Sequence, residues 1–405
     1  MKLNSNEITI ANDKLKEIAE ILLHDNSKAS TFNLMGGKIG HALFFYYYYK
    51  YTKQKIFLEK CIDIISEKIN IFNQFENSNI FFSFADGLSG FGWLLDHFNR
   101  NGEIDFENND FFSKLSDVLF KKMKHLLDTN DFDYLYGATG ICWYFIKTNH
   151  QNINDEKIKY YLDCMQNKAT YIGNTCCWKK NNEDNADLKE INLGLAHGIP
   201  AIMIILSEIS KIESLKIEAL RILKPAIYFL ADYKQDNLLY GSFYPYVYDF
   251  HDLKIINPNN KSRLAWCYGD LSVSWALLKG GIACNDEKIV DFAKEIILSC
   301  TKRRDIKEEL VLDAIVCHGY AGIALLFKKF LIDIHHVEIE DAAKFWLSTT
   351  LSNNNTFQKY LRYNTYLNDY QENHSLLNGI AGIGLVLLSF ISENEIYWDE
   401  CLLLR

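Results

Sequence analysis

The chain has 405 residues and a formal net charge of -9, with 43 Lys and Arg against 52 Asp and Glu, and 48% of its residues are hydrophobic. This composition excludes a largely disordered chain. With a modest acidic excess and no cluster of Lys and Arg, the sequence does not indicate binding to nucleic acid or to an anionic membrane surface. Only four prolines occur, which favours a mainly helical chain because proline breaks helix interiors.

The N-terminal sequence, MKLNSNEITIANDKLKEI, contains no apolar segment typical of a signal peptide. The longest apolar stretches, such as residues 41–49, are too short to be a transmembrane segment. Ten cysteines are irregularly spaced, with an adjacent pair at Cys176 and Cys177, which is not the pattern of a disulfide framework. We therefore expect a soluble protein of the reducing cytoplasm.

One short pattern recurs along the chain: a glycine, two residues, a small residue and then a strongly apolar segment. It occurs seven times, and its first glycines are 50, 50, 61, 71, 50 and 60 residues apart. The copies read GKIGHALFF from residue 37, GLSGFGWLL from 87, GATGICWYF from 137, GIPAIMIIL from 198, GDLSVSWALL from 269, GYAGIALLF from 319 and GIAGIGLVLL from 379. Such a period indicates a repeated supersecondary unit.

Amphipathic segments lie between the apolar ones, in chain order at residues 54–69, 114–127 and 286–300. Their apolar residues fall on one helical face, which predicts helices with one buried and one solvent-exposed face. Each unit is therefore predicted to be a hairpin of an apolar inner helix and an amphipathic outer helix. Two polar segments depart from this pattern. Residues 173–190 are expected to form a loop because they are polar. Residues 233–262 are expected to form a loop or short hairpin because that segment carries aromatic alternation, two prolines and an Asn-rich turn.

Seven helical hairpins can extend as an open solenoid or close on themselves. An open solenoid needs terminal units with a polar outer face. Here the last unit, SLLNGIAGIGLVLLSF, is among the most apolar, which favours closure. We expect residues 1–405 to form a single all-α domain, an α/α toroid, with an excursion around 233–262.

The residues that precede three of the repeat glycines carry candidate chemistry; they are His197, Cys267 with Tyr268, and Cys317 with His318. If each glycine opens an inner helix, these groups lie at one end of the toroid. Two cysteines and a histidine suit zinc, and three protein ligands leave a fourth position open, as in catalytic sites. Each motif taken separately is better explained by buried thiols and a capping histidine; their shared placement before repeat glycines favours the metal site.

These residues resemble the lanthionine synthetase C-like cyclases, zinc enzymes that close thioether rings in lanthipeptides. The resemblance depends on NLGLAHGIP at 192–200, SRLAWCYGD at 262–270, VCHGYAGIA at 316–324 and the seven glycine repeats. It implies an α/α toroid of seven inner and seven outer helices that holds one catalytic Zn²⁺. By motif, it also implies that Cys267, Cys317 and His318 are the zinc ligands.

The resemblance further implies that His197 is the catalytic acid/base, and that Arg263 and Asp133 are further active-site residues. Tyr268, next to Cys267, is a fourth candidate catalytic residue. The fifth unit departs from the family pattern because Asp270 follows its glycine and Ser272 replaces its second glycine. A solvated carboxylate at a helix start is the alternative reading of both Asp133 and Asp270.

The expected reaction is addition of a cysteine thiolate to dehydroalanine or dehydrobutyrine in a dehydrated lanthipeptide precursor, which forms lanthionine or methyllanthionine. Zinc deprotonates the bound thiol, and His197 delivers the proton that the resulting enolate needs. The resemblance implies a dehydratase and an ABC transporter as partners, with association at the membrane through that complex. Two alternatives stay open: an enzyme that adds glutathione to dehydroamino acids in proteins, and a non-catalytic toroid that acts as a binding or scaffold protein.

Overall fold

The computed structural model describes residues 3–25, 32–74, 81–102, 104, 106, 109–150, 153–181, 189–251, 254–352, 361–364 and 367–405. The chain forms two compact units. Unit 1 comprises Met1–Phe81, Ala85–Phe91 and Arg304–Arg405, and unit 2 comprises Phe82–Phe84 and Gly92–Arg303. Helix α4, Leu88–Asn101, begins in unit 1 and continues into unit 2.

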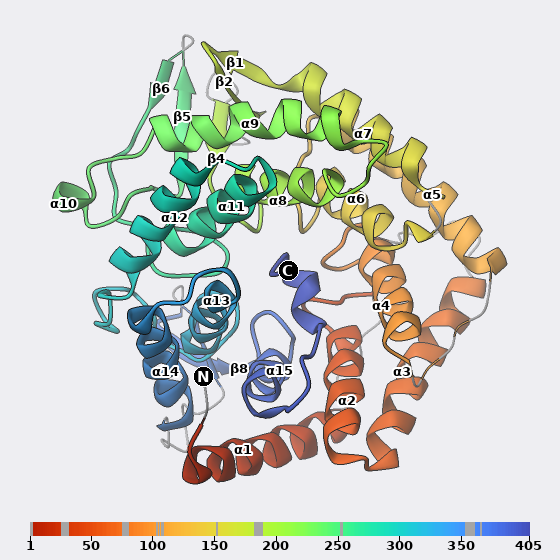
Figure 1. The fold of residues 1–405 in the computed structure, drawn as a ribbon. Coiled ribbons are helices and arrows are strands. Elements are labelled where there is room, and N and C mark those ends of the chain that lie inside the picture. The colour runs from red at the N-terminus through yellow and green to blue at the C-terminus, as the bar shows by residue number, and fades with distance from the viewer. Residues whose placement is uncertain are drawn as a thin grey trace. The chain divides into compact units, whose positions relative to one another are not determined.

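Unit 1 is built from paired helices, labelled in Figure 1. Three apolar helices contact one another in the order α2, α15 and α13, and the helices α3, α1 and α14 pack against them. Their bounds are α1 Ser5–Leu23, α2 Lys38–Thr52, α3 Lys55–Gln74, α13 Tyr320–Asp333, α14 Val337–Ser352 and α15 Ile380–Ile391. A hairpin of β7 (Leu361–Asn364) and β8 (Asp369–Glu372) and a 3-10 helix, Trp398–Leu402, complete this unit.

Unit 2 repeats the arrangement. Helices α6, α8 and α11 contact one another in that order, and α5, α7, α9 and α12 form a second layer over them (Figure 1). The bounds are α5 Asn109–Asp128, α6 Ala138–Lys147, α7 Asp155–Lys168, α8 Ile199–Ile209, α9 Lys216–Asp232, α11 Asp270–Ala283 and α12 Glu287–Cys300. Successive helices therefore form the inner and outer members of hairpins, as the repeat predicts.

The repeat glycines stand where the inner helices begin. They are the N-cap residues of six helices, namely Gly37, Gly137, Gly198, Gly269, Gly319 and Gly379. The small residue three positions later permits close backbone approach: a Cβ on Gly322 would lie 1.8 Å from the carbonyl oxygen of Val316. The pattern in the sequence therefore reflects both helix capping and tight packing of each helix start on the turn before it.

The outer helices are amphipathic, as their sequences predict. In α12 the buried side chains are Ile289, Ala293, Ile296, Ile297 and Cys300, which follow helical spacing, and Asp286 caps the N-terminus. The most apolar helices are short, with 11 residues in α8 and 12 in α15. In the part of the chain that the structure describes, no helix is long and apolar enough to cross a lipid bilayer.

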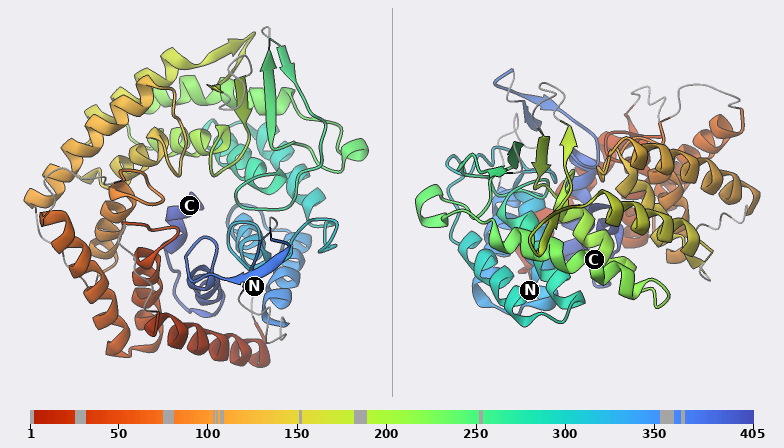
Figure 2. Two further views of the ribbon diagram at one scale, coloured as in Figure 1. Left: turned by 180° about the vertical axis from the view of Figure 1, so that it is seen from behind. Right: turned by 90° about the horizontal axis from the view of Figure 1, so that it is seen from above.

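The two polar segments of unit 2 contribute strands to one sheet, which the sequence did not predict. The order is β3 (Lys180–Asn181), β4 (Lys189–Asn192), β5 (Val247–His251) and β6 (Lys254–Ile256), all antiparallel. Figure 2 shows the β5–β6 hairpin and the short helix α10, Asn237–Tyr240, which projects from the other helices of this unit. Residues 233–262 thus contain the expected hairpin, whose strand β5 pairs with β4 while β6 forms the edge of the sheet.

The expectation of a polar loop at residues 173–190 is wrong for the described part of that segment. Strand β2 (Thr175–Cys177) pairs with β1 (Thr170–Ile172), and both Cys176 and Cys177 are fully buried there. Strand β2 packs against α9, so this cysteine pair belongs to the hydrophobic core. Polar flanking residues concealed this short buried strand in the sequence; residues 182–188 lie outside the described residues.

Candidate active site and metal ligands

Three turns of unit 2, which precede α6, α8 and α11, are joined in a row by backbone hydrogen bonds. The amide of Leu135 donates to the carbonyl of Ala196 over 3.3 Å, and the amide of Ala196 donates to the carbonyl of Cys267, also over 3.3 Å. The first turn carries Asp133, the second His197, and the third Cys267. Residues that are far apart in the sequence are therefore assembled at neighbouring helix starts.

His197 is held by Asp133. Nδ1 of His197 lies 2.7 Å from Oδ2 of Asp133, and the side chains are 28% and 11% exposed. The other carboxylate oxygen, Oδ1, accepts a hydrogen bond from the backbone amide of Tyr136 over 2.9 Å. Because Asp133 occupies Nδ1, the Nε2 edge of the imidazole is the one that remains for chemistry. Asp133 is a bound partner of His197, so its reading as a solvated helix-start carboxylate is wrong.

Opposing effects act on the pKa of His197. Burial lowers this pKa, whereas the hydrogen bond and the charge of Asp133 raise it, and Cys267 acts in the same direction as Asp133. The raising effects prevail, so the pKa of His197 lies above its usual value of 6.5. The imidazole therefore carries its proton over more of the neutral pH range, which suits a general acid.

Tyr268 lies on the turn that carries Cys267, and its ring is close to the imidazole of His197. Its ring centroid is 6.0 Å from that of His197, and its hydroxyl oxygen accepts a hydrogen bond from Nδ2 of Asn192 over 2.9 Å. Burial raises the pKa of Tyr268 to about 12, so its phenol is protonated at neutral pH. Asn192 also accepts a hydrogen bond from the amide of Gly194, which fixes the orientation of its amide group.

The turn that carries Cys267 and Tyr268 depends on Gly269 and Asp270. Gly269 has a φ of 91°, and a Cβ at this position would lie 2.3 Å from the carbonyl oxygen of Arg263. Asp270 is 1% exposed, and its carboxylate accepts hydrogen bonds from the amides of Phe243 and Tyr244.

Arg303 completes the environment of Asp270, with Nη1 3.1 Å from Oδ2. The reading of Asp270 as a solvated helix-start carboxylate is therefore wrong. This carboxylate joins the start of α11 to the segment before β5, a role that depends on partners distant in the sequence. A departure from the family pattern was the only signal for it.

Arg263 begins the same turn, four residues before Cys267. Its backbone amide donates to the hydroxyl of Tyr246 over 3.1 Å, and its Nε is buried with no hydrogen-bond partner among the described residues. Within the same described residues, no hydrogen bond or ion pair joins the Arg263 side chain to Asp133 or His197. The structure thus brings Asp133, His197 and Tyr268 together, and places Arg263 on their supporting turn.

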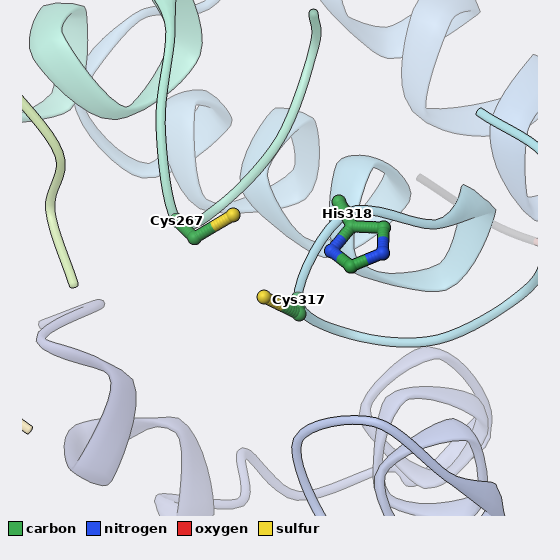
Figure 3. Close-up of side chains that lie close together, drawn as sticks. All are labelled: Cys267, Cys317 and His318. Carbon is green, nitrogen blue, oxygen red and sulfur yellow. The ribbon is translucent and has the colours of Figure 1, made fainter. Parts of the chain in front are cut away.

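Cys317 and His318 belong to unit 1, on the turn before α13. Their ligand atoms lie within 4.8 Å of each other, and the amide of Cys317 donates to the carbonyl of Leu377 over 3.0 Å. Figure 3 draws these two side chains on successive positions of one turn, and Cys267 on the turn before α11. The buried carboxylate of Asp313 braces the turn by accepting from the amides of Ile315 and Tyr363.

The chemistry of these donors can be tested against zinc. Cys267 is 8% exposed and Cys317 is half-buried, and both thiols are free of disulfides. Two thiolate sulfurs and one imidazole nitrogen form a set that zinc prefers over hard oxygen ligands, and three such donors leave one coordination position for a substrate. The residues present therefore fit zinc in their chemistry.

Sequence reasoning missed Asn192 and Tyr136, which contact the candidate residues. Asn192 opens the motif NLGLAHG, five residues before His197, so its position in that motif was an available signal. Tyr136 stands directly before a repeat glycine, as do His197, Tyr268 and His318. That shared position was a signal for Tyr136 as well.

Comparisons with known proteins give a family model, one curated relative and solved structures of similar fold. The model of the family described as lanthionine synthetase C-like protein matches residues 28–403. Nisin biosynthesis protein NisC of Lactococcus lactis subsp. lactis is 28% identical over 296 residues, which cover 68% of this chain and 64% of that protein's length. The alignment thus spans less than two thirds of this relative.

Among solved structures, nisin cyclase covers 98% of both chains with a TM-score of 0.76 and 18% identity. An α-1,6-mannanase from Salegentibacter sp. HEL1_6 covers 94% of this chain and 98% of its own, with 13% identity and a TM-score of 0.47, too low to carry an argument. The likeness to nisin cyclase confirms the all-α fold class, an α/α toroid, that the sequence predicts. Because the family model covers most of the chain, this protein belongs to the lanthionine synthetase C-like family.

Proposed function

We propose that this protein is a lanthipeptide cyclase, which joins cysteine thiols to dehydroalanine or dehydrobutyrine within a dehydrated precursor peptide. The observation that carries the proposal is the pairing of His197 with Asp133, on a turn hydrogen-bonded to that of Cys267. An imidazole held by a carboxylate, on a turn next to the one that carries the proposed metal ligand Cys267, matches two needs of the reaction: a proton donor, and a metal ligand where the substrate thiol would bind. Membership of the family supports the same activity.

Cys267, Cys317 and His318 are proposed to hold a zinc ion, because together they offer two sulfur donors and one nitrogen donor. Zinc bound there would keep the cysteine of the substrate as a thiolate at neutral pH, where a free thiol with a pKa of about 8.5 is mostly protonated. The thiols of Cys267 and Cys317 must be reduced to serve as ligands, which supports a cytoplasmic location.

His197 is proposed as the general acid. The sulfur forms a bond to the β-carbon of the dehydroamino acid, and the π electrons move to the α-carbon and its carbonyl as an enolate. Nε2–H of His197 then delivers a proton to the α-carbon, while Asp133 holds Nδ1 and stabilises the charged imidazole. The proton that left the thiol balances the one consumed, so no oxidant or reductant is needed.

Tyr268 and Arg263 are proposed to stabilise the enolate. Asn192 donates to the oxygen of Tyr268, so the phenolic proton is left to donate elsewhere, and the pKa of about 12 keeps that proton in place at neutral pH. Arg263 offers a positive charge and a buried Nε without a partner among the described residues. Hydrogen-bond donors aimed at developing negative charge are an effective form of transition-state stabilisation.

The partners proposed for this reaction are a dehydratase, which must make the dehydroamino acids first, and a transporter for the cyclised peptide. Family membership supports both. Association with the membrane would then come through that transporter.

Ring closure by purified protein tests the proposal. Zinc-loaded enzyme is mixed with a dehydrated precursor, and thiols that remain open to alkylation are counted by mass spectrometry. A protein-free sample sets the floor, because dehydrated cysteine peptides close slowly without enzyme. Loss of free thiols well above that floor supports a cyclase. A parallel sample with glutathione and a dehydrated peptide lacking cysteine tests the glutathione alternative, which predicts adducts there and no gain in ring closure.

A further inference from the structure

Tyr136 lies beside the proposed general acid, and the reaction described above does not use it. The ring centroids of Tyr136 and His197 are 6.0 Å apart and the ring planes are inclined by 11°, so the rings are nearly parallel. This separation falls in the range of offset-stacked aromatic pairs. Tyr136 therefore forms one wall next to the imidazole.

The position of this ring is fixed by the same groups that hold His197. The amide of Tyr136 donates to Oδ1 of Asp133, whose Oδ2 binds the imidazole. The neighbouring residue Leu135 donates from its amide to the carbonyl of Ala196, the residue before His197. These three bonds hold the backbone of Tyr136 in a defined position relative to His197.

An aromatic row runs across this part of unit 2. Tyr268 lies 6.0 Å from His197 in addition to Tyr136, and Tyr246 follows Tyr268 at 5.6 Å with its ring plane at 86°. Tyr246 and Tyr268 are half-buried, whereas Tyr136 is 53% exposed. Tyr136 is thus the more exposed of the two tyrosines that lie 6.0 Å from His197.

We propose that Tyr136 is a specificity-determining residue, whose exposed ring binds an apolar side chain next to the dehydroamino acid of the peptide. The proposal depends on the proposed function, because it assigns the ring to the peptide that His197 would protonate. When the α-carbon of the dehydroamino acid approaches Nε2 of His197, the next residue of the peptide also lies near this site. Its Cα is only about 3.8 Å from the Cα of the dehydroamino acid. An apolar neighbour then buries surface against the ring, whereas glycine offers no side chain to bury.

Binding can be measured apart from ring closure. Two fluorescein-labelled dehydrated peptides lack cysteine, so that they cannot cyclise, and differ only in the residues flanking dehydroalanine, which are Leu in one and Gly in the other. Anisotropy titrations give Kd for each peptide with the full-length wild-type protein, Tyr136→Ala and Tyr136→Phe. Tyr171→Ala is the matched control, because Tyr171 is 52% exposed on β1, outside the aromatic row.

The wild type is expected to bind the Leu peptide about five- to tenfold more tightly than the Gly peptide, the ratio for burial of a leucine against one ring face. Tyr136→Ala should remove this preference, and Tyr136→Phe and Tyr171→Ala should retain it. An equal preference in the wild type and in Tyr136→Ala would overturn the proposal. A second outcome would also overturn it: Tyr136→Ala keeps the preference for the Leu peptide but closes rings equally more slowly in cysteine-containing versions of both peptides. That result would mean that Tyr136 acts through His197.

The two proposals fail separately. A protein that shows the Tyr136-dependent preference but closes no rings refutes the cyclase activity and leaves the peptide subsite standing. A protein that closes rings without that preference supports the cyclase and refutes the subsite.

Discussion

Asp133 and His197 are 64 residues apart in the sequence, yet Oδ2 of the carboxylate lies 2.7 Å from Nδ1 of the imidazole. The two residues precede the starts of different inner helices, α6 and α8, and the backbone bond from Leu135 to Ala196 holds their turns together. The carboxylate thereby selects which ring nitrogen remains available for proton transfer. It also makes the charged imidazole more stable than burial alone would allow.

Removal of the imidazole should stop proton delivery without removing the metal. His197→Ala is expected to slow ring closure about 10²–10⁴-fold, the usual contribution of a general acid. Zinc content and the thermal unfolding midpoint should stay near those of the wild type, because His197 is not a proposed ligand. The alkylation assay, metal analysis and a thermal scan check these points. Near-normal ring closure would leave His197 with a structural role only.

The pH dependence of ring closure should reveal the effect of Asp133 on the pKa of His197. Its hydrogen bond and charge raise the pKa of His197 against the lowering effect of burial, so Asp133→Asn should bring this pKa down. A general acid acts when protonated; the alkaline limb of the kcat profile should therefore move to lower pH in the variant. At pH 7.5 we expect a loss no larger than the ~10²–10⁴-fold that a general acid contributes. An alkaline limb in the same place would show that Asp133 does not control the acid.

The metal prediction concerns Cys317. If Cys267, Cys317 and His318 share one ion, the wild type should hold about one zinc per chain, and Cys317→Ala should lose most of it, because two ligands bind zinc far less firmly than three. Cys164→Ala is the matched control, since Cys164 is also a half-buried free cysteine but lies in α7. Zinc per chain is measured by mass spectrometry after dialysis. Unchanged zinc in Cys317→Ala would remove this residue from the site.

The buried pair of Asp270 and Arg303 should matter for folding. Asp270→Asn leaves the Arg303 guanidinium, only 10% exposed, without its charged partner, at an expected cost of about 3–5 kcal/mol in the free energy of unfolding. The pair of Lys159 and Glu218, whose side chains are 50% and 33% exposed, provides the control, and Glu218→Gln should change stability little. Urea unfolding of both variants measures the difference. Equal midpoints for the two variants would contradict a structural role for Asp270.

The helices and their order were predictable because their signals are local. A glycine before an apolar run marks a helix start, and apolar spacing marks one buried face, so the inner helices and α12 follow from short stretches of sequence. Candidate residues such as His197 and Cys317 were found by their place before repeat glycines. The buried strand β2 was missed because three residues between polar neighbours carry too little periodicity to be recognised.

The contacts between distant segments could be seen only in the folded chain. Asn192 is hydrogen-bonded to Tyr268, 76 residues away in the sequence, and Asp270 to Arg303, 33 residues away. Strands β4 and β5 pair two segments, each of which resembles a loop when its sequence is considered alone. Hydrogen bonds and ion pairs of this kind depend on which turns pack together, and periodicity along one segment carries no information about that. The types of residue available for chemistry can thus be predicted from short stretches of the sequence. Which ring nitrogen, phenol or carboxylate is free to act is decided by tertiary packing.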